Sequence, residues 1–84
     1  MADRLHLLQL ALADRIVRKH PSAVVTPELL LAQALVVTDD MYGTSAYAEQ
    51  VERDLANSLP PILPDDTRDA YAQRLRLVAE GAVL

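Results

Sequence analysis

The feature that most constrains this chain is its supply of core-forming side chains. It contains no Cys, Phe or Trp, so disulfides cannot stabilise it and its core must be aliphatic. The 84 residues include 15 Leu, 13 Ala, 8 Val and 2 Ile. Leu and Ala are among the strongest helix formers, whereas aromatic and β-branched residues favour strands. A chain of this length forms one domain with a small stability margin. The composition therefore predicts a single all-α domain over residues 1–84.

Prolines and glycines divide the chain into four predicted helices, over about residues 3–19, 27–42, 46–59 and 67–81. Pro27 suits the first position of the second helix because its missing N–H is not needed there. Gly43 is the expected left-handed residue at the end of that helix. The expected N-caps are Thr26 for the second helix, Thr44 or Ser45 for the third, and Asp65 or Asp66 for the fourth.

The second helix is the one expected at the centre of the bundle. Within residues 29–37 only Gln33 is polar, and a helix that is apolar on nearly every side is usually buried. We therefore expect a small compact bundle of about four helices around it, with Leu35 in the core. Ile62 and Leu63, in the proline-rich connection, are expected to tuck against this bundle. The nearest alternative is a three-helix core with an extended fourth segment.

Residues that could carry catalysis are sparse. His6 and His20 are the two histidines, and the second is placed where a partly charged ring stabilises the end of a helix. No Ser-His-Asp spacing and no Gly-rich phosphate loop is present. We therefore expect no enzymatic activity, no catalytic residue and no cofactor.

Residues 38–49, which span the junction of the second and third predicted helices, have the twelve-residue length of an EF-hand calcium loop. This segment matches at the third, sixth and twelfth positions. The first and fifth positions, which need oxygen ligands, hold Thr38 and Tyr42. Too few carboxylates remain to hold the ion, so no metal site is expected.

The charge balance argues against binding to nucleic acid. The chain has 8 basic and 12 acidic residues, a net charge of −4 and a pI near 4.9, whereas nucleic-acid-binding domains usually have a pI above about 9. Arg68, Arg74 and Arg76 do not fall on one stripe of the fourth helix at the helical angle of about 100° per residue. Nucleic acid is therefore not an expected partner, and a DNA-associated regulator acting as a dimer is the alternative function.

The expected location is the cytoplasm. No apolar run approaches the about 18 residues of a membrane span, so no membrane association is expected. His6 and Gln9 interrupt the Leu-rich start, which a secretory signal does not tolerate. The excess of Arg over Lys, together with the many Ala and Leu residues, is typical of proteins from high-GC bacteria and favours a bacterial, plasmid or phage origin.

The first helix carries more apolar surface than a bundle requires. Its expected core stripe consists of Leu5, Leu8, Leu12 and Ile16. Ala13, Val17 and Leu10 lie about 80–140° from Leu5 around the helix, and Leu7 about 200° from it. A surface helix usually needs an apolar stripe only somewhat wider than about 100°.

Two interpretations of this second apolar arc remain open. Either neighbouring helices flank the first helix on two sides, or Leu7, Leu10, Ala13 and Val17 contact another chain. The second interpretation predicts a protein interface at these four residues. The function that we favour from the sequence is a small non-enzymatic interaction protein, such as a regulator, adaptor or inhibitor. It would bind another protein through an apolar helix face and self-associate as a homodimer.

Overall fold

The computed structural model describes residues 4–43 and 45–81, which form four α-helices. The helices are α1 (Arg4–Ile16), α2 (Pro27–Tyr42), α3 (Ala46–Ser58) and α4 (Arg68–Ala79). In these residues the extended pairing is limited to an isolated antiparallel bridge between Val24 and Thr67. The predicted all-α bundle of about four helices is therefore confirmed.

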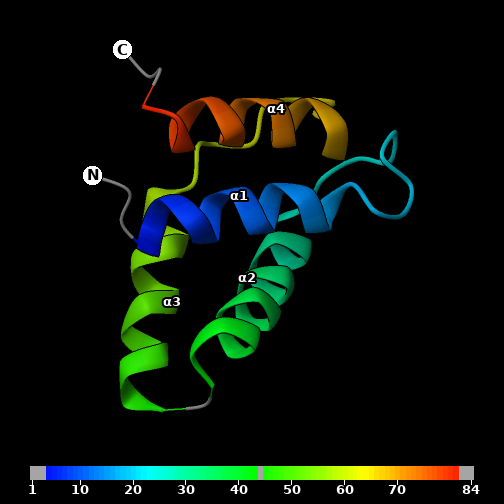
Figure 1. Cartoon of the computed structure of the whole chain (residues 1–84). Coiled ribbons are helices and arrows are strands. Elements are labelled where there is room, and N and C mark those ends of the chain that lie inside the picture. The colour runs from blue at the N-terminus through cyan, green and yellow to red at the C-terminus, as the bar shows by residue number, and fades with distance from the viewer. Residues whose placement is uncertain (1–3, 44, 82–84) are drawn as a thin grey trace.

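The central helix is α1. It contacts each of the other three helices, and Figure 1 shows it between α4 on one side and the ends of α2 and α3 on the other. Leu12 at its middle is fully buried. The prediction that the second helix is central is wrong, because Leu31 and Leu35 of α2 are 56% and 47% exposed. α2 packs against α1 and α3. Its opposite face is exposed to solvent even though leucines lie on it.

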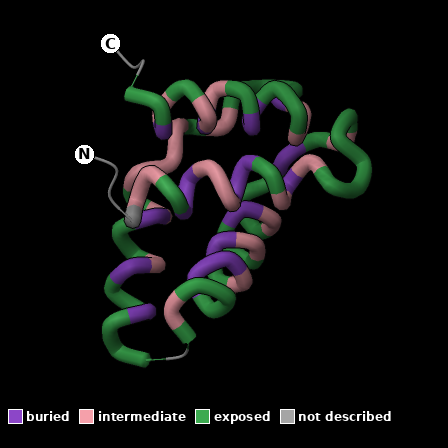
Figure 2. The backbone as a smooth tube through the Cα atoms, in the orientation of Figure 1, coloured by how far each residue is buried: buried purple, intermediate pink, exposed green. Residues whose placement is uncertain are grey.

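The core is one apolar cluster to which all four helices contribute. Its buried members are Leu8, Leu12, Ala13, Ile16, Val25, Leu30, Ala34, Val37, Val51, Leu55, Tyr71, Ala72 and Leu75. Figure 2 shows these buried segments on the sides of the helices that face one another. Ile62 packs against the cluster as predicted. Leu63 does not, since it is about half exposed. Successive side chains of an extended connection face opposite ways, which allows only one of the pair to pack.

The predicted N-caps of α2 and α3 and the predicted C-cap of α2 are confirmed. The Thr26 hydroxyl accepts a backbone N–H of the first turn of α2 at 3.1 Å, and α2 ends at Gly43, which has a φ of 74°. Ser45 caps α3 in the same way. α1, by contrast, ends at Ile16, three residues before its predicted end.

The link between α1 and α2 pairs with the start of α4. The Val25 N–H donates to the Asp66 carbonyl, and the Arg68 N–H donates to the Ala23 carbonyl, both at 2.9 Å. These two hydrogen bonds hold the beginning of α4 next to the end of α1, so the two helices lie antiparallel along the side of the bundle (Figure 1).

Neither acid predicted to cap α4 does so. The Asp66 carboxylate instead accepts a hydrogen bond from Arg74 at 2.9 Å and another from the Leu63 N–H at 3.1 Å, and the residue is buried. Thr67 is the N-cap, and its hydroxyl accepts the Ala70 N–H at 3.1 Å. The Asp66–Arg74 pair thereby ties the proline-rich connection to α4.

Tyr71 completes this attachment. Its side chain is fully buried, its hydroxyl donates to the Pro60 carbonyl at 2.6 Å, and the Arg74 guanidinium lies 5.1 Å from the ring centre. Burial, which penalises the charged phenolate, raises the pKa of Tyr71 to about 12. The hydroxyl therefore stays protonated at neutral pH and remains a hydrogen-bond donor to the connection.

Candidate functional site

The predicted interface on α1 contains one residue that another chain cannot reach. Ala13 is fully buried and belongs to the core cluster. The prediction is wrong for Ala13, because α4 packs along this side of α1. His6, which shares that side, hydrogen-bonds the Ala79 carbonyl of α4. Val17 is partly buried and packs against the same cluster. Flanking by neighbouring helices therefore accounts for the inner part of the arc.

The outer part of the α1 arc is a narrow strip. Leu10 is partly buried, and Leu7 is 49% exposed. Further along this strip lies Asp14. Its carboxylate oxygens are 3.7 Å from a guanidinium nitrogen of Arg18 and 3.9 Å from a guanidinium nitrogen of Arg76 in α4. Beyond Leu7 the exposed side of α1 is thus charged, and the predicted interface is reduced to Leu7 and Leu10.

A more extensive apolar surface lies on α2. Leu31 and Leu35 are both about half exposed, and they are four residues apart, which places them one above the other on the same face of a helix. Isolated exposed leucines are normal on protein surfaces, but adjoining ones form a patch that carries more meaning.

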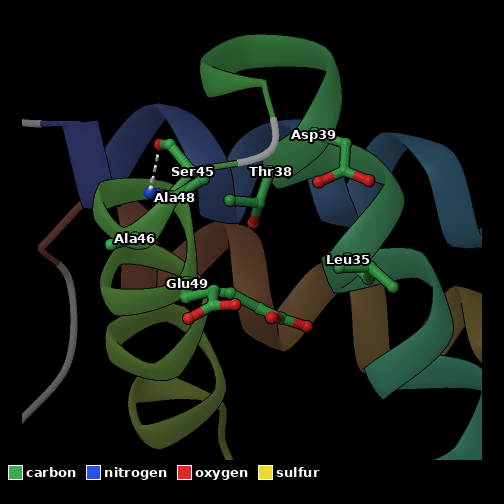
Figure 3. A pocket seen from close by; sticks show the side chains of 8 residues that line it. Leu35, Thr38, Asp39, Ser45, Ala46, Ala48 and Glu49 are labelled. Atoms are coloured by element: carbon green, nitrogen blue, oxygen red, sulfur yellow. Dashed lines mark hydrogen bonds between the residues drawn. The ribbon is translucent and has the colours of Figure 1, made fainter.

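A groove continues this patch between the second half of α2 and the first half of α3. It has a volume of about 390 Å³ and is lined by Leu35, Thr38, Asp39, Ser45, Ala46, Ala48, Glu49 and Glu52. Figure 3 shows the residues of α2 and those of α3 on opposite walls. Leu35 belongs to both the leucine patch and the groove. We call Leu31 and the lining residues together the hairpin surface.

The hairpin formed by α2 and α3 holds the chain's excess of negative charge. Residues 27–58 contain six acidic residues and one basic residue, Arg53, a net charge of −5. Since the whole chain has a net charge of −4, the remaining residues are together close to neutral. Among the described residues, no basic side chain forms an ion pair with Asp39, Glu49 or Glu52. The groove is therefore lined by both apolar and acidic side chains.

The arginines of α4 do not form a recognition face. Arg74 binds Asp66, Arg76 lies near Asp14, and Arg68 donates to the Lys19 carbonyl at 3.2 Å. Each is directed to a different partner within the chain. This arrangement agrees with the prediction that the three do not share one stripe.

The segment tested as a calcium loop is divided between two helices. Thr38 lies within α2, where it is buried and donates its hydroxyl to the Ala34 carbonyl at 2.8 Å. Within residues 4–43 and 45–81 no three His, Asp or Glu side chains are placed to hold a metal ion. Over the same residues, none of the helices has the length and apolar character needed to cross a membrane.

The hairpin surface is not predicted from the sequence, because a helix as apolar as residues 29–37 is expected at the centre of the bundle. One signal was available in the sequence. Leu31, Leu35 and Asp39 are spaced four residues apart, so they lie on one stripe of the helix, and that stripe ends in an acidic residue. A stripe of that kind is typical of a helix edge facing solvent rather than of a central helix.

Comparison of the chain with protein-family models, curated proteins and solved structures gives no match.

Proposed function

We propose that this chain is a small non-enzymatic interaction module, such as a regulator, adaptor or inhibitor, that binds another protein through the hairpin surface. The observation that carries the proposal is the exposure of Leu31 and Leu35 beside the groove. Burying a leucine stabilises a protein by roughly 1.5–3 kcal/mol. A domain with so small a core that leaves two adjoining leucines in water has surface available for a partner.

The position of the hairpin supports this proposal. α4 packs against α1 and makes no helix contact with α2 or α3, and Figure 1 shows the hairpin projecting from the layer that α1 and α4 form. Its outer face is therefore free along the length of Leu31, Leu35 and the groove. A partner could bind there without displacing any element that holds the core.

The proposal predicts that binding can be removed without loss of folding. We expect the tagged parent chain to retain a discrete protein from cells that express it, and the Leu31→Gln/Leu35→Gln variant to lose it. The matched control is Leu77→Gln, on α4, where the leucine is equally exposed. Both variants should keep the helical circular dichroism of the parent. Equal retention by all three proteins would contradict the proposal.

The second candidate function is self-association through α1, which the half-exposed Leu7 and the neighbouring Leu10 favour. It predicts a dimer for the parent in light scattering coupled to size exclusion, and a folded monomer for Leu7→Glu, because an unpaired carboxylate is costly in an apolar interface. Val17→Glu should unfold the chain instead, since Val17 packs against the core. A parent that is monomeric at high concentration contradicts this candidate.

A further inference from the structure

We propose that the segment bound by the hairpin surface is a basic amphipathic helix of another protein. An aliphatic side chain of that helix would enter the α2–α3 groove, and its Arg or Lys side chains would lie beside Asp39, Glu49 and Glu52. This inference rests on the proposed function and adds the chemistry of the partner. The charge of the groove, its apolar lining and its shape support it.

The carboxylates of the groove have no cation to balance them. Asp39 stands in the last turn of α2, which holds no basic residue. That end of a helix carries the negative pole of its dipole, so acids there are unfavourable. Glu49 is favourably placed in the first turn of α3, but together with Glu52 it adds to the negative charge of the groove that Asp39 also lines. Local charges that oppose the helix rules without an internal partner are expected mainly at functional sites.

An aliphatic side chain suits the groove. Leu35, Ala46 and Ala48 supply its apolar lining. The two hydroxyls among the lining residues are engaged within the chain: Thr38 donates to the Ala34 carbonyl, and Ser45 accepts the Ala48 N–H. A volume of about 390 Å³ is ample for one large aliphatic side chain. The polar recognition is therefore left to the three carboxylates.

The shape of the groove favours a helix as the occupant. Its walls are helices and not strands, so they offer no strand edge for an extended peptide. Recognition of an amphipathic helix in a groove uses apolar anchors three or four residues apart, the same spacing that Leu31 and Leu35 have on α2. The hairpin of a second copy is a poor occupant, because two surfaces with net charge −5 repel each other.

The test uses two synthetic helical peptides with leucines at every third or fourth position. One carries arginines beside the leucines, and the other carries glutamate in place of each arginine. In fluorescence anisotropy titrations with the full chain we expect the arginine peptide to bind at least about tenfold more tightly. This preference should shrink as salt is raised, because the charges involved are exposed to solvent. Equal affinities, or binding of neither peptide, overturn the inference.

A pair of variants with the same change in net charge locates the effect. Glu49→Gln/Glu52→Gln should weaken binding of the arginine peptide by about three- to tenfold, as expected for two partly exposed ion pairs. Asp40→Asn/Glu80→Gln removes two charges outside the groove and should change it by less than about twofold. Equal weakening by both variants overturns the assignment to the groove.

Failure of this inference can be told apart from failure of the proposed function. If the arginine peptide is not preferred but Leu31→Gln/Leu35→Gln still loses the captured protein, a partner binds the hairpin surface by another chemistry. If capture does not depend on the two leucines, the proposed function itself is wrong. Oligomers of the parent chain that Glu49→Gln/Glu52→Gln dissociates would identify a second copy as the occupant and overturn the inference.

Discussion

Leu12→Ala is expected to lower the free energy of unfolding by about 2–5 kcal/mol, the range for large-to-small changes in a core. Leu12 is fully buried at the middle of α1, the helix that contacts the other three. The lost methyl groups would leave a cavity that packed neighbours on several sides cannot close. Whole domains are stable by only about 5–15 kcal/mol, so the loss is a large fraction of the total. Urea denaturation followed by circular dichroism measures it.

Leu35→Ala is the matched comparison. Leu35 is 47% exposed, so its truncation should cost less than about 1 kcal/mol, well below the cost of truncating Leu12. The sequence alone predicted a core position for Leu35. A loss as large as that of Leu12→Ala would restore that prediction, and it would remove the leucine patch from the hairpin surface.

Asp66→Ala is expected to destabilise the chain by about 2–4 kcal/mol. The change would leave the Arg74 guanidinium without its ion pair and the Leu63 N–H without its acceptor. The side chain of Asp66 is 4% exposed and that of Arg74 is 30% exposed. Water can therefore compensate only the arginine, which places the cost below that of a fully buried pair. Thermal and urea unfolding of the variant measure the loss.

Two further variants show whether this cost comes from the buried pair. Asp14→Ala removes a partner from exposed ion pairs, in which the Asp14 side chain is 67% exposed, and should cost less than about 1 kcal/mol. Asp66→Ala/Arg74→Met should recover part of the stability lost by Asp66→Ala, since no charge is then left unpaired. A small loss for Asp66→Ala would show that the proline-rich connection is not held by this network.

The helices could be predicted from the sequence because their ends depend on local chemistry. Thr26, Ser45 and Gly43 cap their helices where the pattern placed them. The N-cap of α4 could not be predicted in this way. Asp66 and Thr67 are both suitable capping residues. The Asp66 carboxylate is hydrogen-bonded to Arg74, which lies further along α4, so Thr67 becomes the N-cap.

The arrangement of the helices could not be read from their composition. α2 is the most apolar helix, but α1 lies at the centre. The central helix is the one against which the most other helices pack, and hydrophobicity alone does not decide which helix that is. The candidate site was hard to predict for the same reason, because the sequence does not show which helix faces are covered. Ala13 packs in the core and Leu7 remains at the surface. Leu35, which was predicted to lie in the core, forms a larger exposed patch with Leu31. The periodicity of the sequence shows which residues share a face of a helix, but it does not show which other element covers that face.

The central claim, that another protein binds at the hairpin surface, is tested most directly by photo-crosslinking in cells that express the chain. A benzoylphenylalanine residue replaces Leu35 in one variant and Leu77 in the other, two leucines of similar exposure on different faces. We predict a discrete adduct with another protein from position 35 and a much lower yield from position 77. No adduct from position 35, or equal yields from the two positions, would contradict the claim.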